Sequence, residues 1–184
     1  MPVVVIEQDE MELKHSVELH LNAALETLRL VSAEIKSDVE PEALEGELRT
    51  SYSFRPASSK RIDNALLLDL FFELNILQTQ DDSAPHTIAS LACTFRARYS
   101  LRPRFQPTPE QIKAFHAGNA IFNCWPFFRE FVQSSSVRLA LPPPPVPFLR
   151  FGPKPPPVAK EASPTGSPSK AKRRPSKRTP VEHA

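Results

Sequence analysis

Alternation of apolar and polar residues predicts four β-strands before residue 102. In the clearest run, Leu48, Tyr52 and Phe54 alternate with Arg49 and two serines. A period of two is that of a strand with one buried and one solvated face. The first run contains a phase slip of the kind that a β-bulge absorbs. The predicted strands are residues 28–35, 44–54, 66–76 and 87–101.

Short connections between these strands predict an antiparallel meander. A loop containing Pro56, Ser58 and Ser59 follows the second strand. Residues 81–85, Asp-Asp-Ser-Ala-Pro, have the composition of a turn before the last strand.

One helical segment is predicted after the sheet, with Thr108 as N-cap and Pro109 at the first helical position. Its apolar residues are not confined to one face, so the helix needs cover on more than one side. One stripe contains Ile121, Trp125, Phe128 and Val132, and Phe122, Phe127 and Phe131 lie outside it.

Pro126 predicts an irregularity in this helix. It cannot donate an amide hydrogen bond, and it disfavours helical geometry at Trp125. We expect a kink or a restart there, with Asn123 as a cap, and a longer second part that ends near Leu139.

The first 24 residues carry two conflicting signals. Leu13, Val17 and Leu21 recur at helical spacing, whereas residues 3–6, Val-Val-Val-Ile, are typical of a strand. The pattern alone leaves the structure of this segment open.

The C-terminal part differs in composition from the rest. Residues 142–147 are nearly all Pro and favour extended polyproline geometry, and residues 152–184 lack apolar periodicity, which predicts disorder. We expect one domain over residues 1–150 and a basic tail over residues 151–184. The tail has eight Lys or Arg and two Glu, so its net charge is +6, whereas the net charge of the whole chain is +2.

Composition argues against an enzyme and against a secreted protein. Only four Gly are present, with no phosphate-binding loop, and the five His have no metal-like spacing. Cys124 near His116 is best explained as a buried cysteine, since no activating base with an orienting partner can be named. With two Cys, no secretory signal and no long apolar run, we expect a cytoplasmic protein without membrane insertion or cofactor.

The unpaired apolar faces indicate a polypeptide partner. The third strand carries Leu67 and Phe71 on its second face, and the helix is apolar on more than one side. One sheet and one helix share a single interface, so an oligomer, a peptide groove or both would cover the remainder.

Two segments resemble the SecB export-chaperone family, in particular its divergent SecB-like members. Residues 118–130 end in Trp-Pro-Phe-Phe-Arg-Glu, similar to the aromatic-Pro-aromatic-x-Arg-Glu stretch at the start of that family's main helix. Residues 141–148 resemble the loop that follows it. The order of elements over residues 28–148 is also similar.

The resemblance implies an α+β fold in which one main kinked helix lies on one face of a four-stranded antiparallel sheet, assembled as a dimer of dimers. It implies an ATP-independent chaperone that holds unfolded preproteins or antitoxin-like clients in hydrophobic grooves, with SecA as a further partner in export. The chain departs from the family where a second C-terminal helix would follow, because Phe151 leads directly into the Pro-rich tail.

Two alternative functions are an adaptor that binds one folded partner and a nucleic-acid-binding regulator that acts through the tail. Nucleic acid is the less favoured partner, because no aromatic residue is interleaved with the basic run.

These considerations predict three sets of functional residues. Client binding is assigned to Leu67, Phe71, Trp125, Phe127 and Phe131. Subunit packing is assigned to Ile121, Phe122, Phe128 and Val132. The basic run is Lys170, Lys172, Arg173, Arg174, Lys177 and Arg178.

Overall fold

The computed structural model describes residues 3–38, 44, 46–79 and 84–153. Residues 81–83 of the predicted turn, the tail from residue 154 and its basic run lie outside the described residues. Residues 151–153, which were assigned to the tail, lie in a strand paired with residues 6–8, so the tail prediction was wrong for them. The predicted disorder from residue 154 and the division into domain and tail stay predictions.

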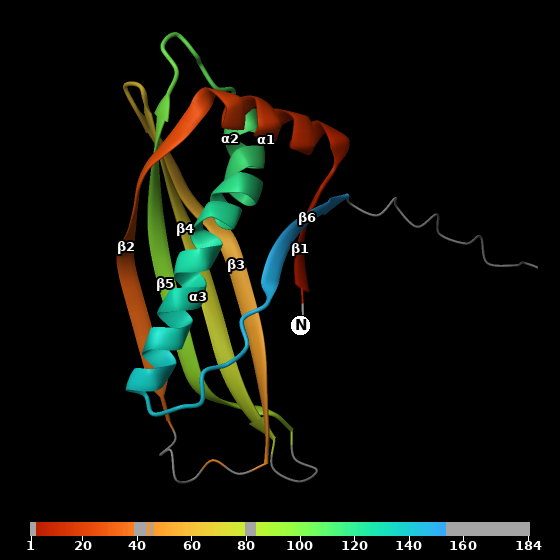
Figure 1. Cartoon of the computed structure of the whole chain (residues 1–184), viewed down its shortest axis with the longest axis vertical. Coiled ribbons are helices and arrows are strands. Elements are labelled where there is room, and N and C mark those ends of the chain that lie inside the picture. Colours follow the sequence, from red (N-terminus) through yellow and green to blue (C-terminus); the bar gives the residue numbers. More distant parts are fainter. Residues whose placement is uncertain (1–2, 39–43, 45, 80–83, 154–184) are drawn as a thin grey trace, which may run out of the picture. The chain divides into compact units, whose positions relative to one another are not determined.

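The described part is built on a four-stranded antiparallel sheet, as predicted (Figure 1). Its strands are β2 (Ala23–Ser37), β3 (Glu47–Ile62), β4 (Ala65–Thr79) and β5 (His86–Leu101). The spatial order is β2-β5-β4-β3, so only the last three strands form a meander. The first strand pairs with β5 and not with its sequence neighbour β3, which the meander prediction missed.

Strand β3 runs through the segment that was predicted to be a loop. The register shifts between Pro56 and Ser58, which marks a bulge, and pairing with β4 continues to Ile62. A proline is tolerated here because β3 is an edge strand, where the missing N–H costs no ladder bond. The hydroxyl of Ser58 donates to a carboxylate oxygen of Asp69 on β4 at 2.9 Å.

The N-terminal segment contains both structures that its pattern suggested. Strand β1 (Val3–Gln8) precedes helix α1 (Glu10–Asn22), which begins with a capping box between Asp9 and Glu12. Beyond the Pro-rich segment, β6 (Phe148–Pro153) pairs with β1 in parallel. A two-stranded sheet thus joins the first and last described elements of the chain (Figure 1).

The kinked helix is confirmed, but its irregularity lies elsewhere than predicted. It consists of α2 (Pro109–Phe115), the π-helical turn η2 (His116–Ala120) and α3 (Ile121–Arg138), and Thr108 caps α2 as expected. Pro126 lies inside α3, and no restart occurs at Trp125. Asn123 is not a cap, because it lies inside α3, and its side-chain amide donates to the Tyr99 hydroxyl at 3.0 Å.

Packing explains why α3 continues through Pro126. A proline inside a helix costs about 3 kcal/mol. The neighbouring Trp125 ring packs against Phe54, at 5.5 Å between centroids, and Phe128 stacks on Phe72 of β4 at 5.0 Å. Burial of these large rings between helix and sheet offsets the lost hydrogen bond.

The core lies between the helix and one face of the sheet. Figure 1 shows α2 and α3 running across that face, with α1 crossing the end of the sheet near α2. From β4, alternate side chains enter the core, while Leu67 and Phe71 lie on the opposite face and are half-buried. No helix in the described part of the chain is long and apolar enough to cross a bilayer.

Candidate functional site

Four phenylalanine rings face outward from α3 and β6. Phe122, Phe127, Phe148 and Phe151 are each between 38% and 48% exposed. Phe122 stacks on Phe151, with 5.4 Å between ring centroids and 29° between planes. Phenylalanine is normally among the more buried residues, so this concentration of exposed rings marks an interaction surface. We call these four residues the aromatic surface; Phe122 meets β6 at Phe151, whereas Phe127 lies on the other flank of α3, 6.5 Å from Phe95 of β5 between ring centroids.

Helix α1 extends the apolar surface. Its stripe of Leu13, Val17 and Leu21 faces outward, at 43% to 61% exposure, while Leu19 is the apolar residue that α1 buries fully. Leu13 and Phe151 line one groove with a volume of about 360 Å³, which we call the α1–β6 groove. Its other lining residues are Gln8, Asp9, Glu10 and Gly152.

The α1–β6 groove is held in place by the pairing of β1 with β6. A Cβ atom on Gly152 would lie 2.5 Å from a methyl carbon of Val5, so only glycine allows this close approach. Gln8 anchors the other side, because its amide nitrogen donates to the carbonyl of Ala114 in α2 at 2.9 Å. Within the described residues, β1 and β6 pair only with each other, so each keeps one edge open to a further strand.

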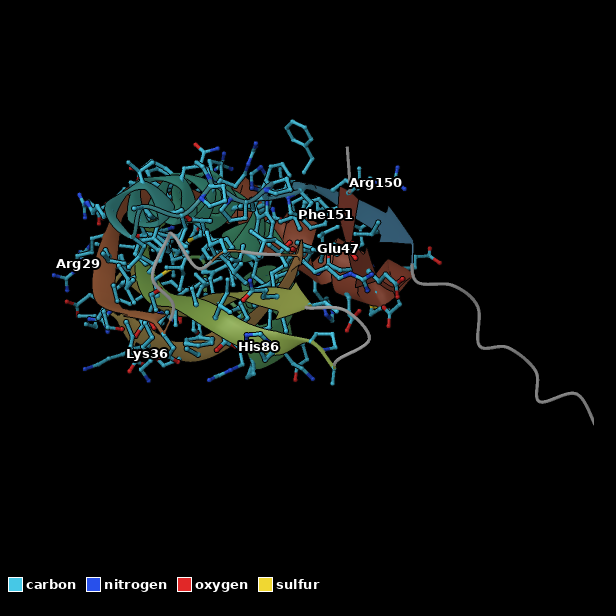
Figure 2. The ribbon with its side chains drawn as sticks, turned by 90° about the horizontal axis from the view of Figure 1, so that it is seen from below. Arg29, Lys36, Glu47, His86, Arg150 and Phe151 are labelled. Atoms are coloured by element: carbon cyan, nitrogen blue, oxygen red, sulfur yellow. The ribbon has the colours of Figure 1, made fainter. Side chains whose placement is uncertain are left out.

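Figure 2 places this surface within the molecule. Phe151 and Arg150, which belong to β6, lie on the opposite side of the view from Arg29 of β2.

A second pocket lies between α3 and the Pro-rich segment. It has a volume of about 220 Å³ and is lined by Arg129, Gln133 and residues 143–148. The guanidinium carbon of Arg129 lies 4.7 Å from the ring centre of Phe148. The indole N–H of Trp125 donates to the carbonyl of Pro147 at 2.9 Å, which fixes the Pro-rich segment against α3.

The predicted client-binding residues do not form one patch. Phe127 lies on the aromatic surface, whereas Leu67 and Phe71 lie on the far face of the sheet, where Arg55 covers the Phe71 ring at 4.7 Å. Trp125 and Phe131 are only 4% and 8% exposed, because they belong to the core of this chain. Their role in client binding stays a prediction.

The residues assigned to subunit packing are also divided. Ile121, Phe128 and Val132 are buried within this chain, and Phe122 is exposed on the aromatic surface. Sequence reasoning assigned no role to Phe148, Phe151 or the stripe of α1. The helical spacing of Leu13, Val17 and Leu21 was visible, but the pattern did not say which way the stripe faces.

The two residues considered as nucleophile and base, Cys124 and His116, are buried. Burial raises the pKa of the Cys124 thiol to about 12, as it does for Cys93, so both thiols stay protonated. Burial lowers the pKa of His116, whose Nε2 lies 2.8 Å from the carbonyl oxygen of Asp69. Among residues 3–38, 44, 46–79 and 84–153, no group of three His, Cys, Asp or Glu could hold a metal.

No family model matches the chain, and neither does any curated protein. Among solved structures, the chain is similar to the SecB-like chaperone Rv1957 of Mycobacterium tuberculosis, solved in complex with a ChAD peptide from the HigA1 antitoxin, Rv1956. The identity is 24% and the TM-score 0.65, over 77% of this chain and 100% of Rv1957. A protein of unknown function from Streptococcus agalactiae matches at 12% identity and a TM-score of 0.36, over 68% of this chain and 97% of that one.

The similarity to Rv1957 confirms that this chain has the SecB-like fold, which the Trp-Pro-Phe-Phe-Arg-Glu stretch suggested. Where a second C-terminal helix would follow α3, the described residues form a different structure. Residues 139–153 contain no helix, and β6 occupies positions 148–153 instead.

Proposed function

We propose that this protein is a chaperone that binds extended, non-native polypeptides on the aromatic surface and in the α1–β6 groove. The observation that carries the proposal is the outward stacking of Phe122 on Phe151 beside the groove that Leu13 lines. The antitoxin peptide bound to Rv1957, which has the same fold, supports a peptide ligand here too.

Two interactions with different specificity would hold the client. Burial of apolar client side chains contributes about 25 cal/mol per Å² whatever their identity, so the aromatic surface would tolerate many sequences. An extended client can also add a strand to the open edge of β1 or β6, through backbone hydrogen bonds that do not depend on sequence. Together they give broad recognition of unfolded chains.

No nucleotide hydrolysis or other catalysis is part of this proposal. Capture and release would follow the binding equilibrium alone, in the cytoplasm. The clients would be unfolded preproteins, which SecA would receive, or labile antitoxins.

Self-association belongs to the same proposal. The edge strand β2 exposes an apolar row that includes Leu25, Leu30, Val31 and Ile35, and a second copy would cover it in a dimer of dimers. A solution mass equal to that of one chain, measured by light scattering, would contradict this assembly.

Suppression of aggregation tests the function. At stoichiometric excess, the full chain should delay the aggregation of several unrelated denatured proteins and form complexes with them that gel filtration isolates. Substitution of both Phe122→Ser and Phe151→Ser should remove most of this activity. Val137→Ser is the matched control, because Val137 is an exposed apolar residue of α3 outside the aromatic surface.

Circular dichroism melts must show that the double variant is folded. The proposal fails if the unmodified chain suppresses no aggregation and binds no denatured protein. Activity toward one folded partner alone would indicate an adaptor.

A further inference from the structure

Arg129 is a cation with an unsatisfied donor. Its Nε is buried and has no hydrogen-bond partner among the described residues, and its guanidinium forms no ion pair with any of them. Four other cations in the described chain lie within 3 Å of a carboxylate, so Arg129 differs from Lys36, Arg49, Arg96 and Arg98. Because the buried Nε is closed to solvent, an external acceptor would reach the other guanidinium nitrogens, which bond to no described residue.

The pocket beside Arg129 contains no negatively charged side chain that could pair with its guanidinium. Its wall contains Pro143, Pro144, Pro145 and Pro147, which have no N–H, together with Val146 and Phe148. No carboxylate lines it, and Gln133 is the one polar side chain besides Arg129. A ligand that enters the pocket therefore meets a single positive charge between apolar walls, where Coulomb attraction is stronger than in bulk water.

The guanidinium of Arg129 packs on an aromatic ring. One face lies on the Phe148 ring, which leaves the N–H edge to point away from the ring. The ring in turn follows Pro147, whose carbonyl is bound by the Trp125 indole. A planar guanidinium packed in this way suits a carboxylate, which accepts two parallel N–H bonds from it.

We propose that Arg129 binds the carboxylate of an Asp or Glu side chain in the client polypeptide. The inference rests on the proposed function and names a recognition element within it. Phe148 belongs both to the aromatic surface and to the Arg129 pocket, so an acidic client residue would bind next to apolar ones. Clients with an acidic residue inside an apolar stretch are then preferred over purely apolar ones.

Fluorescence anisotropy with defined peptides tests the proposal on the full chain. The probe is a fluorescein-labelled, C-amidated peptide in which Phe alternates with Ser around one central Glu. A second peptide carries Gln in place of the Glu, and a third carries the Gln together with a free C-terminal carboxylate. We expect the Glu peptide to bind about tenfold more tightly than the Gln peptide, as for a hydrogen-bonded charge.

Variants of the protein locate the effect. Arg129→Gln should bind the Glu and Gln peptides alike, with the affinity that the unmodified chain has for the Gln peptide. Arg138→Gln is the matched control, because Arg138 is an exposed arginine in the last turn of α3, and it should keep the full preference. If Arg129→Gln does not fold, the comparison of the Glu and Gln peptides on the unmodified chain still decides the question of preference.

The outcomes separate the two proposals. Equal binding of both amidated peptides by the unmodified chain, or a preference that survives Arg129→Gln, overturns the Arg129 site and leaves the chaperone proposal standing. A preference for the free C-terminal carboxylate alone overturns the assignment to a side chain. If none of the peptides binds and no aggregation is suppressed, the chaperone proposal fails and the Arg129 site fails with it.

Discussion

Phe122 of α3 and Phe151 of β6 stack with 5.4 Å between their ring centroids, although both rings remain open to solvent. The contact joins the main helix to a strand that the chain forms only after the Pro-rich segment. Because β6 is paired with β1, the position of Phe151 depends on Val5 and Gly152 as well as on Phe122. The aromatic surface is therefore a product of three segments that are distant in sequence.

Gly152→Ala should loosen the β1–β6 pair. The new Cβ would clash with Val5, and overpacking of this kind costs about 1–3 kcal/mol. Hydrogen exchange should show lower protection of β1 and β6 amides, with little change in β4. Val5→Ala removes the clashing methyl groups, so the Gly152→Ala, Val5→Ala double variant should recover protection. Unchanged exchange in Gly152→Ala would show that the strands shift without cost.

Trp125→Phe should lower the free energy of unfolding by about 1–3 kcal/mol, because the buried Pro147 carbonyl loses its donor while an aromatic ring is kept. Urea denaturation measures the change. Tyr52→Phe is the control, since the Tyr52 ring also lies against Trp125, at 6.3 Å, and its hydroxyl has no bond to a described residue. Equal effects of the two variants would mean that the indole bond contributes nothing.

Stability should fall as the pH is lowered through the ordinary pKa of His116, which is 6.5. Burial lowers the folded-state pKa, so between the two values the unfolded chain binds more protons than the folded one. The contribution is complete above 6.5 and is lost as the pH falls toward the folded-state pKa. Melting temperatures from about pH 8 to about pH 5 should show this slope.

Substitution of His116 isolates its part of the slope. His116→Gln keeps a donor toward the Asp69 carbonyl without a titrating ring, so it should flatten the dependence. His20→Gln, at an exposed position of α1, is the control for the loss of one histidine. A slope that persists in His116→Gln would assign it to another group.

Asp69→Asn should lower the melting temperature by about 2–4 °C at neutral pH. The Asp69 carboxylate accepts two bonds from Arg96, at 2.6 and 2.7 Å, and these hold its pKa below the ordinary value of 3.8. Since the folded-state pKa is lowered, this stabilisation is present above pH 3.8 and is lost as the pH falls through the folded value. Calorimetry at neutral and acidic pH measures both effects.

The exposed pair of Lys36 and Glu34 supplies the control for Asp69. Both side chains are mostly solvated, and such pairs contribute little to stability. Lys36→Gln should therefore shift the melting temperature less than Asp69→Asn does. The reverse order would contradict the view that burial makes the Asp69 pair the stronger one.

Features that depend on local pattern could be predicted from the sequence. The alternation at Leu48, Tyr52 and Phe54 identified a strand, and Thr108 with Pro109 identified the start of the helix. These signals are local because side-chain direction in a strand and capping at a helix start depend on a few adjacent residues. The loop predicted around Pro56 is part of β3 instead. A proline can lie in this strand because β3 is at the edge of the sheet, and the local sequence does not show which strand is at the edge.

Only the tertiary structure decided which apolar residues face outward. The helical spacing of Leu13, Val17 and Leu21 left their orientation open, and in the structure these residues face outward while α1 packs through Leu19. Trp125 was assigned to client binding, but it lies in the core, packed against Phe54 and bonded to the Pro147 carbonyl. The sequence alone determined the strand period, the helix start and the resemblance to SecB. Contacts between distant segments, above all β1 with β6, decided the aromatic surface, because burial depends on which partner covers a face and not on the spacing of residues along it.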